Sequence, residues 1–75
     1  MNSHEKLIRI LKRFGDPPYE MGITELSREM GVSKSGIHKI IRSLVQESLL
    51  VQNPSTKKYS LGPLVFRLGN VYSDS

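Results

Sequence analysis

Residues 33–46, SKSGIHKIIRSLVQ, combine an apolar repeat with a run of hydrogen-bonding and cationic side chains. At about 100° per residue in a helix, the apolar side chains fall within one arc, and these are Ile37, Ile40, Ile41 and Leu44. The opposite arc holds Ser35, His38, Lys39, Arg42 and Gln46. Residues 33–46 contain no acidic residue, and the first acid after them is Glu47, although exposed helix faces usually mix both signs and gain from ion pairs. The stretch therefore predicts a helix with one packed face and one face suited to a polyanion.

The positive charge of the chain is concentrated in its second half. The formal net charge is +4 over 75 residues. Residues 1–32 contain five basic and five acidic residues, whereas residues 33–69 contain six basic residues and a single acid, Glu47. A local excess of this kind is typical of a surface that meets nucleic acid, and the alternative is an ordinary solvated surface.

Catalytic and metal-binding chemistry has little basis in this sequence. The absence of cysteine excludes disulfides, thiolate nucleophiles and Cys-based metal sites. His4 and His38 fall in different predicted helices, and no set of Ser, His and Asp suggests a nucleophile with its base. We therefore expect no enzymatic activity, no bound metal and no cofactor.

The elements that must position residues 33–46 begin with two further helices. Ser3 is expected to cap a first helix that ends at Gly15, before the rigid loop D-P-P. Residues 19–22 are expected to continue that loop, and Thr24 to cap a second helix. Gly31 is the natural left-handed stop of this helix. A turn of about three residues then leads to Ser33 as the next cap, which is a helix-turn-helix.

A hairpin and a last helix follow the helix-turn-helix. The extended runs LLVQN and KYSL are separated by the turn residues Pro54, Ser55 and Thr56, with Lys57 and Lys58 close to the tip. Pro63 suits the first position of a short final helix. The fold class is therefore mainly α with a small β-hairpin: a single winged helix-turn-helix domain over residues 1–75, with a three-helix core, a two-stranded wing and a short C-terminal helix.

Such a module predicts binding to double-stranded DNA. An α-helix fits the major groove, so the third helix (about residues 33–47) is expected there, and the wing (about residues 49–61) on the backbone or in the minor groove. Arg42 and Lys39 have the side chains that can bind guanine O6 and N7. The candidate DNA-binding residues are Ser33, Lys34, Ser35, Gly36, His38, Lys39, Arg42, Lys57 and Lys58.

Several of these candidates have a purely structural alternative. Ser33 can serve only as a helix cap, and its side-chain role is compatible with a backbone contact to phosphate. His38 can be an ordinary exposed histidine. Lys57 and Lys58 can simply keep the hairpin edge soluble.

The sequence resembles the N-terminal DNA-binding domain of the IclR family of prokaryotic transcription regulators. The resemblance lies in KLIRILKRF, in GITELSREMGVSKSGIHKIIRSLVQ and in NPSTKKYSLGPLVFRLG, which together cover almost the whole chain. The last block is the most specific, because Tyr59, Leu61, Gly62 and the pair Leu68-Gly69 follow the order typical of the family after its wing.

The resemblance implies a transcription regulator that binds DNA as a homodimer, with the first helix and the segment after the wing joining the subunits. Val65, Phe66, Val71 and Tyr72 suit that role, although in an isolated chain they could instead cover the core. It also implies a C-terminal effector-binding domain, which is absent from these residues, so we expect no small-molecule ligand here. The chain is then either a fragment or a free-standing module.

Two positions depart from the family pattern. Gly36 follows Ser35 where Ser-Thr is usual, which removes a hydroxyl and weakens the helix by about 1 kcal/mol relative to Ala. Ser48 and Leu49 replace a common Gly-Tyr pair, so the helix end lacks its left-handed glycine.

No segment approaches the roughly 20 apolar residues of a membrane span, so we expect a soluble, cytoplasmic protein without a membrane partner. A winged-helix protein–protein interaction module is the alternative function, and it would need an acidic or apolar patch on the third helix.

Overall fold

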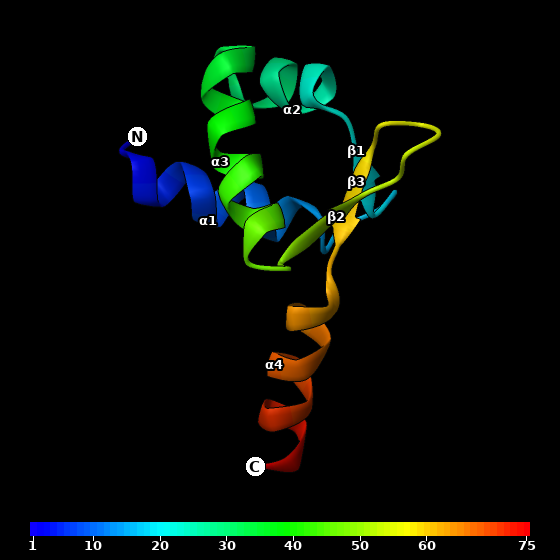
Figure 1. The fold of residues 1–75 in the computed structure, drawn as a ribbon. Helices are drawn as coiled ribbons and strands as arrows, with labels where there is room; N and C mark the ends of the chain where they lie inside the picture. Colours follow the sequence, from blue (N-terminus) through cyan, green and yellow to red (C-terminus); the bar gives the residue numbers. More distant parts are fainter.

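The computed structural model describes all 75 residues, which form four helices and a small sheet (Figure 1). In chain order the elements are α1 (Ser3–Arg13), β1 (Glu20–Met21), α2 (Ile23–Met30), α3 (Lys34–Gln46), β2 (Leu50–Gln52), β3 (Tyr59–Leu61) and α4 (Pro63–Asp74). The three N-terminal helices, the hairpin of β2 and β3 and the final helix confirm the winged helix-turn-helix fold. No helix combines the length and the apolar character that crossing a membrane requires.

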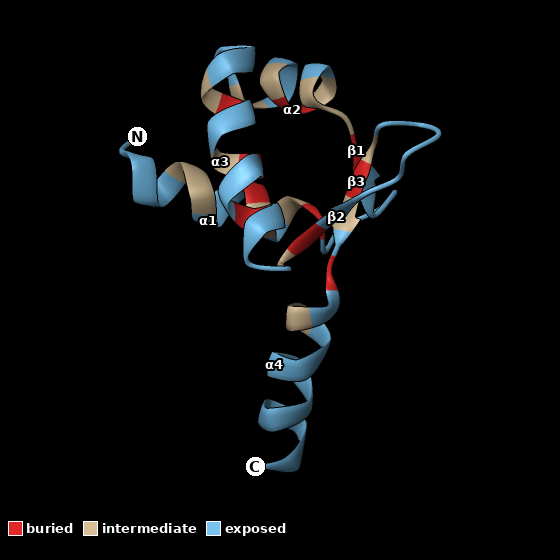
Figure 2. Ribbon diagram, in the orientation of Figure 1, coloured by how far each residue is buried: buried red, intermediate tan, exposed pale blue.

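One hydrophobic core joins every helix and strand except α4 (Figure 2). Its nine buried side chains are Ile10, Phe14, Met21, Leu26, Ile37, Ile41, Leu44, Leu50 and Tyr59. Because α3 alone supplies three of them, its apolar arc fixes which side of this helix is left for solvent. Tyr59 packs into this core, as a hairpin side chain is expected to do.

The turn between α2 and α3 has the predicted geometry. Gly31 lies in the left-handed region with φ of 65°, and its N–H donates to the carbonyl of Ser27. The Ser27 hydroxyl donates to the carbonyl of Val32 at 2.6 Å. Ser33 then caps α3, with its Oγ accepting the N–H of Gly36 at 3.1 Å. Hydrogen bonds from side chains and backbone on both sides of the turn thus fix the orientation of α3 relative to α2.

The ends of the first two helices differ from the sequence-based prediction. Asn2, not Ser3, caps α1, because its Oδ1 accepts the N–H of Glu5 at 2.9 Å. The helix ends at Arg13, before Gly15. The cap of α2 is Gly22 rather than Thr24. Gly22 has no side chain that could accept a hydrogen bond from the helix. Instead, its own N–H donates to the Glu25 carboxylate at 3.0 Å, which is one of the two hydrogen bonds of a capping box.

The wing hairpin belongs to a three-stranded antiparallel sheet of order β1-β3-β2. In the hairpin, Leu50 pairs with Leu61 and Gln52 with Tyr59. The prediction that residues 19–22 form only a connection is wrong, because Glu20 and Met21 form β1 and pair with β3. The wing is therefore bound on its inner edge to the segment that leads into α2.

The last helix, α4, extends away from the rest of the molecule and carries the C-terminus at its far end (Figure 1). It contains no buried residue and is exposed along almost its whole length (Figure 2). Phe66, Val71 and Tyr72 are 71%, 68% and 86% exposed. The alternative that Phe66, Val71 and Tyr72 cover the core is therefore wrong, whereas Val65 is half-buried at the start of α4. The nine-residue core includes no side chain of α4.

Ser48, after the end of α3, adopts a left-handed conformation although it is not glycine. Its φ is 61°. Its N–H donates to the carbonyl of Val45 at 3.0 Å. The left-handed conformation that the resemblance places at a glycine is thus present here at a serine.

Candidate nucleic-acid interface

The outward side of α3 carries the polar face that the sequence predicts. Ile37, Ile41 and Leu44 are buried against the core. The exposed side chains on the other side include all five that the sequence places there, Ser35, His38, Lys39, Arg42 and Gln46. They project from a single helix whose buried side is fixed by packing, so the backbone positions that carry them are set before any ligand binds.

The start of α3 offers hydrogen-bond donors beside the exposed Lys34. The first N–H groups of a helix have no partner within the helix, and the positive end of the helix dipole lies there. Ser33 Oγ takes one of these groups, the N–H of Gly36, and lies 3.3 Å from Ser35 Oγ. The structure therefore confirms Ser33 as a cap, while the N–H groups of Lys34 and Ser35 face the helix end.

Gly36 is half-buried at the base of this cap rather than part of the outward face. A Cβ at this position would lie 3.2 Å from Ser33 Oγ and 3.2 Å from Val32 Cγ1. An added side chain would press on the cap, so the gain in helix propensity expected for alanine is opposed by crowding.

The cations of α3 have no acidic partner. The two ion pairs of the molecule join Arg13 to Glu29 and Lys58 to Glu25. Lys34, Lys39 and Arg42 are exposed and belong to neither pair. No acidic residue lies within α3, so the acidic patch that a protein-interaction helix would need is absent there.

The turn at the tip of the wing is organised by Asn53, a role that the sequence analysis did not assign. Its Oδ1 accepts the N–H groups of Ser55 at 2.8 Å and Thr56 at 3.1 Å. Lys57 follows with φ of 66° and an exposed side chain, and its N–H donates to the carbonyl of Asn53. Asn followed by Pro is a turn signal that could have indicated this arrangement.

Lys57 and Lys58 have different surroundings. Lys57 makes no side-chain hydrogen bond or ion pair, whereas Lys58 Nζ lies 3.7 Å from Glu25 Oε1 at the start of α2. The two wing lysines therefore lie on a separate element from the polar face of α3, and one of them is turned toward α2. No local pattern in the sequence predicts this pairing of Glu25 with Lys58.

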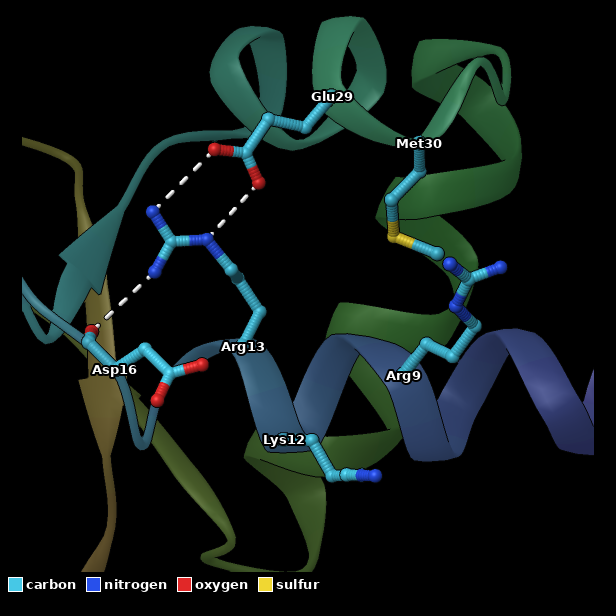
Figure 3. Close-up of a pocket in the computed structure, with 6 residues that line it drawn as sticks. All are labelled: Arg9, Lys12, Arg13, Asp16, Glu29 and Met30. Atoms are coloured by element: carbon cyan, nitrogen blue, oxygen red, sulfur yellow. Dashed lines mark hydrogen bonds and ion pairs between the residues drawn. The ribbon is translucent and has the colours of Figure 1, made fainter.

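A shallow cavity of about 300 Å³ lies between α1 and α2 (Figure 3). Its prominent feature is a two-point ion pair, in which Arg13 Nε lies 2.9 Å from Glu29 Oε2 and Arg13 Nη2 lies 3.3 Å from Glu29 Oε1. The hydrogen bonds that Arg13 donates to the Glu29 carboxylate raise the pKa of Arg13 above its usual value. Arg13 also donates to the carbonyls of Asp16 and Pro17, so it joins α1, the following loop and α2.

This cavity is bridged by the Arg13–Glu29 ion pair, which joins α1 to α2. Its lining residues are Arg9, Lys12, Arg13, Asp16, Glu29 and Met30, and they include no nucleophile beside a base. No three His, Cys, Asp or Glu side chains gather anywhere in the molecule in a way that could hold a metal ion.

Residues 3–54 match the model of the IclR helix-turn-helix domain. The HTH-type transcriptional regulator XynR of Escherichia coli is 34% identical over 93% of this chain, which corresponds to 28% of that protein. The glycerol operon regulatory protein of Streptomyces griseus is 30% identical over 99% of this chain and 29% of its own length. The chain thus spans less than a third of these curated relatives.

Solved structures share the fold. An IclR transcriptional regulator from Alicyclobacillus acidocaldarius superimposes with a TM-score of 0.90 and 30% identity, over 96% of this chain and 29% of that one. HmgR of Pseudomonas aeruginosa gives a TM-score of 0.84 and 28% identity, over 99% of this chain and 32% of its own. Both similarities extend past the wing, because they cover nearly all of the chain.

Proposed function

This chain belongs to the IclR helix-turn-helix family, a family of DNA-binding domains in transcription regulation, and we propose that its α3 enters the major groove of double-stranded DNA. The observation that carries the proposal is the exposed face of α3, where cations and hydroxyls occur with no acidic partner. A helix of this width matches the major groove, and outward side chains then face base edges.

The side chains of α3 suit different parts of the DNA. Lys39 and Arg42 can donate to guanine O6 and N7, and Arg42 can do so with two parallel bonds. Ser35 and His38 lie on the same face and can donate to bases or to the backbone. Lys34 and the free N–H groups at the helix start suit a phosphate, with Ser33 and Gly36 shaping that start.

The wing is proposed to contact the backbone or the minor groove beside the α3 site. Lys57 is the exposed cation at its tip. Lys58, the second lysine expected there from the sequence, is held by Glu25. On a random-sequence duplex, where Lys39 and Arg42 meet no matched guanine, we count Lys34, Lys39, Arg42 and Lys57 as the four cations that neutralise phosphates.

Binding to a random-sequence duplex of about 25 base pairs, followed by fluorescence anisotropy across a salt series, tests the proposal. Four neutralised phosphates give a log-log slope near −3.6, at about −0.9 for each phosphate. The variant Lys39→Ala/Arg42→Ala is expected to reduce the slope to about −1.8. Its matched control, Arg9→Ala/Lys12→Ala, removes the same two side-chain types from α1 and is expected to keep the parent slope.

Two results would contradict the proposal. Binding of the parent chain that does not respond to salt would exclude a phosphate interface. An equal loss of slope in the α1 control would mean that net charge, rather than the face of α3, governs binding.

We further propose a homodimer joined through α4. At about 100° per residue, Leu64, Leu68 and Val71 fall on one side of this helix, and Val65 and Tyr72 lie beside them. Leu68, Val71 and Tyr72 are more than half exposed. An apolar stripe of this kind on a helix outside the core suits contact with a second copy.

We propose that the chain acts as a binding domain without catalysis, because its curated relatives are named as regulators. A cytoplasmic location follows from chromosomal DNA as the proposed ligand in a prokaryotic cell. Residues 1–75 are proposed to act as one DNA-binding domain, whether alone or within a longer protein.

A further inference from the structure

Glu25 occupies the junction between the wing and the helix-turn-helix. Its Oε1 accepts the N–H of Gly22 at 3.0 Å, and the same oxygen lies 3.7 Å from Lys58 Nζ. The first contact fixes the carboxylate at the start of α2, where the helix dipole favours a negative charge. The carboxylate is therefore positioned independently of Lys58 and presents a fixed anion to the wing.

The backbone of the wing brings Lys58 to this anion. Met21 of β1 pairs with Tyr59 of β3, the residue after Lys58. The N–H of Lys58 donates to Thr56 Oγ1 at 3.2 Å, and its carbonyl accepts the N–H of Asn53 at 2.8 Å. Both sides of Lys58 are thus hydrogen-bonded, which limits where its side chain can reach.

From this geometry we infer that Glu25 is a positioning residue of the DNA-binding surface, which keeps Lys58 away from phosphate and leaves Lys57 as the phosphate-binding cation of the wing. This inference rests on the proposed DNA-binding function and specifies which of the two wing lysines contacts phosphate. Exposed ion pairs are usually weak because two flexible side chains must be ordered. Here the Glu25 carboxylate and the backbone of Lys58 are each held by other hydrogen bonds, which lowers that cost. Glu25 sets the balance because it is held by Gly22 whether or not Lys58 is present.

The inference predicts that removal of one acid strengthens DNA binding through one named lysine. Glu25→Gln keeps an oxygen that can accept the Gly22 N–H, so α2 retains its start. Lys58 is then free to neutralise a further phosphate, which steepens the log-log salt slope by about 0.9. Between 50 and 200 mM salt, that change corresponds to roughly a threefold larger loss of affinity.

A double-mutant cycle with Lys58→Met separates this effect from a general change of charge. Lys58→Met alone is expected to leave the slope of the parent chain unchanged, and Glu25→Gln is expected to have no effect on the slope in the Lys58→Met background. Glu20→Gln is the matched control, because Glu20 is an exposed acid on β1 without a side-chain partner. It removes the same charge near the same sheet and is expected to keep the slope.

Two outcomes of the cycle would overturn the inference. If Lys58→Met alone reduced the slope by about 0.9, Lys58 would already bind phosphate in the parent chain. If Glu25→Gln or Glu20→Gln steepened the slope equally with and without Lys58, the effect would be one of net charge. Both outcomes can be told apart from failure of the proposed function. In that case the parent chain itself would show no salt-dependent binding.

Discussion

The backbone of Ser48 lies directly against Gly62, so that the end of α3 and the start of α4 meet. A Cβ on Gly62 would collide with the Ser48 carbonyl oxygen and would lie 2.9 Å from its carbonyl carbon. The Ser48 carbonyl also accepts the N–H of Leu64 at 3.0 Å. The N–H of Gly62 donates to the carbonyl of Leu49 at 2.8 Å. The direction of α4 is therefore fixed by the segment that follows the end of α3.

Gly62→Ala is expected to destabilise the domain because the added methyl group must displace backbone rather than a flexible side chain. Overpacking of this kind costs about 1–3 kcal/mol. Gly69→Ala in α4 is the matched control, since nothing lies within 4 Å of a Cβ there. It is expected to raise stability by up to about 1 kcal/mol. Urea unfolding followed by circular dichroism measures the free energy of unfolding of both variants. Equal changes in Gly62→Ala and Gly69→Ala would contradict the close contact at Gly62.

Ser48→Gly is expected to stabilise the domain. A left-handed conformation costs a residue with a Cβ about 1–2 kcal/mol, and glycine avoids that cost while gaining some entropy in the unfolded chain. A net gain near 1 kcal/mol in the free energy of unfolding is expected. The reverse change, Gly31→Ser at φ of 65°, is expected to lower stability by a similar amount. A loss of stability in Ser48→Gly would show that the Ser48 side chain has a role of its own.

The sequence predicted features that depend on neighbouring residues better than features that depend on distant ones. The Gly31 stop and the Ser33 cap are local, and both were predicted correctly. Strand β1 has two residues, too few for a periodic pattern, and it exists only because β3 lies beside it. The pairing of Glu25 with Lys58 likewise needs the folded wing. Helical spacing predicted α4, but it could not tell whether its apolar side chains would pack on the core.

Asn53→Ala is expected to loosen the tip of the wing. The change removes the acceptor of the Ser55 and Thr56 N–H groups, so both amides are expected to exchange faster with solvent. Asn53→Asp keeps the acceptor oxygen and is expected to retain slow exchange. Hydrogen exchange followed by NMR compares the two variants, with amides of α3 as an internal reference. Unchanged exchange in Asn53→Ala would mean that the backbone bonds between Asn53, Lys57 and Lys58 hold the turn alone.

Leu68→Asp/Val71→Asp is expected to weaken association of the chain with itself, because it places two charges in the apolar stripe that we propose as the subunit contact. A buried, unpaired charge disfavours such an interface by several kcal/mol, whereas the same charge on an exposed helix face costs little. Both side chains lie outside the core, so the fold of the monomer is expected to survive. Sedimentation equilibrium over a range of concentrations measures the dimer dissociation constant.

Phe66→Asp provides the control for that experiment. Phe66 is 71% exposed on the same helix but, at about 100° per residue, lies on the side opposite Leu68 and Val71. It is expected to leave the dimer dissociation constant within about threefold of the parent value, because an exposed face loses little on substitution. A greater loss of dimer affinity in Phe66→Asp than in the double variant would show that the subunit contact lies on the other side of α4. A parent chain that stays monomeric at every concentration would exclude residues 63–74 as a sufficient subunit contact.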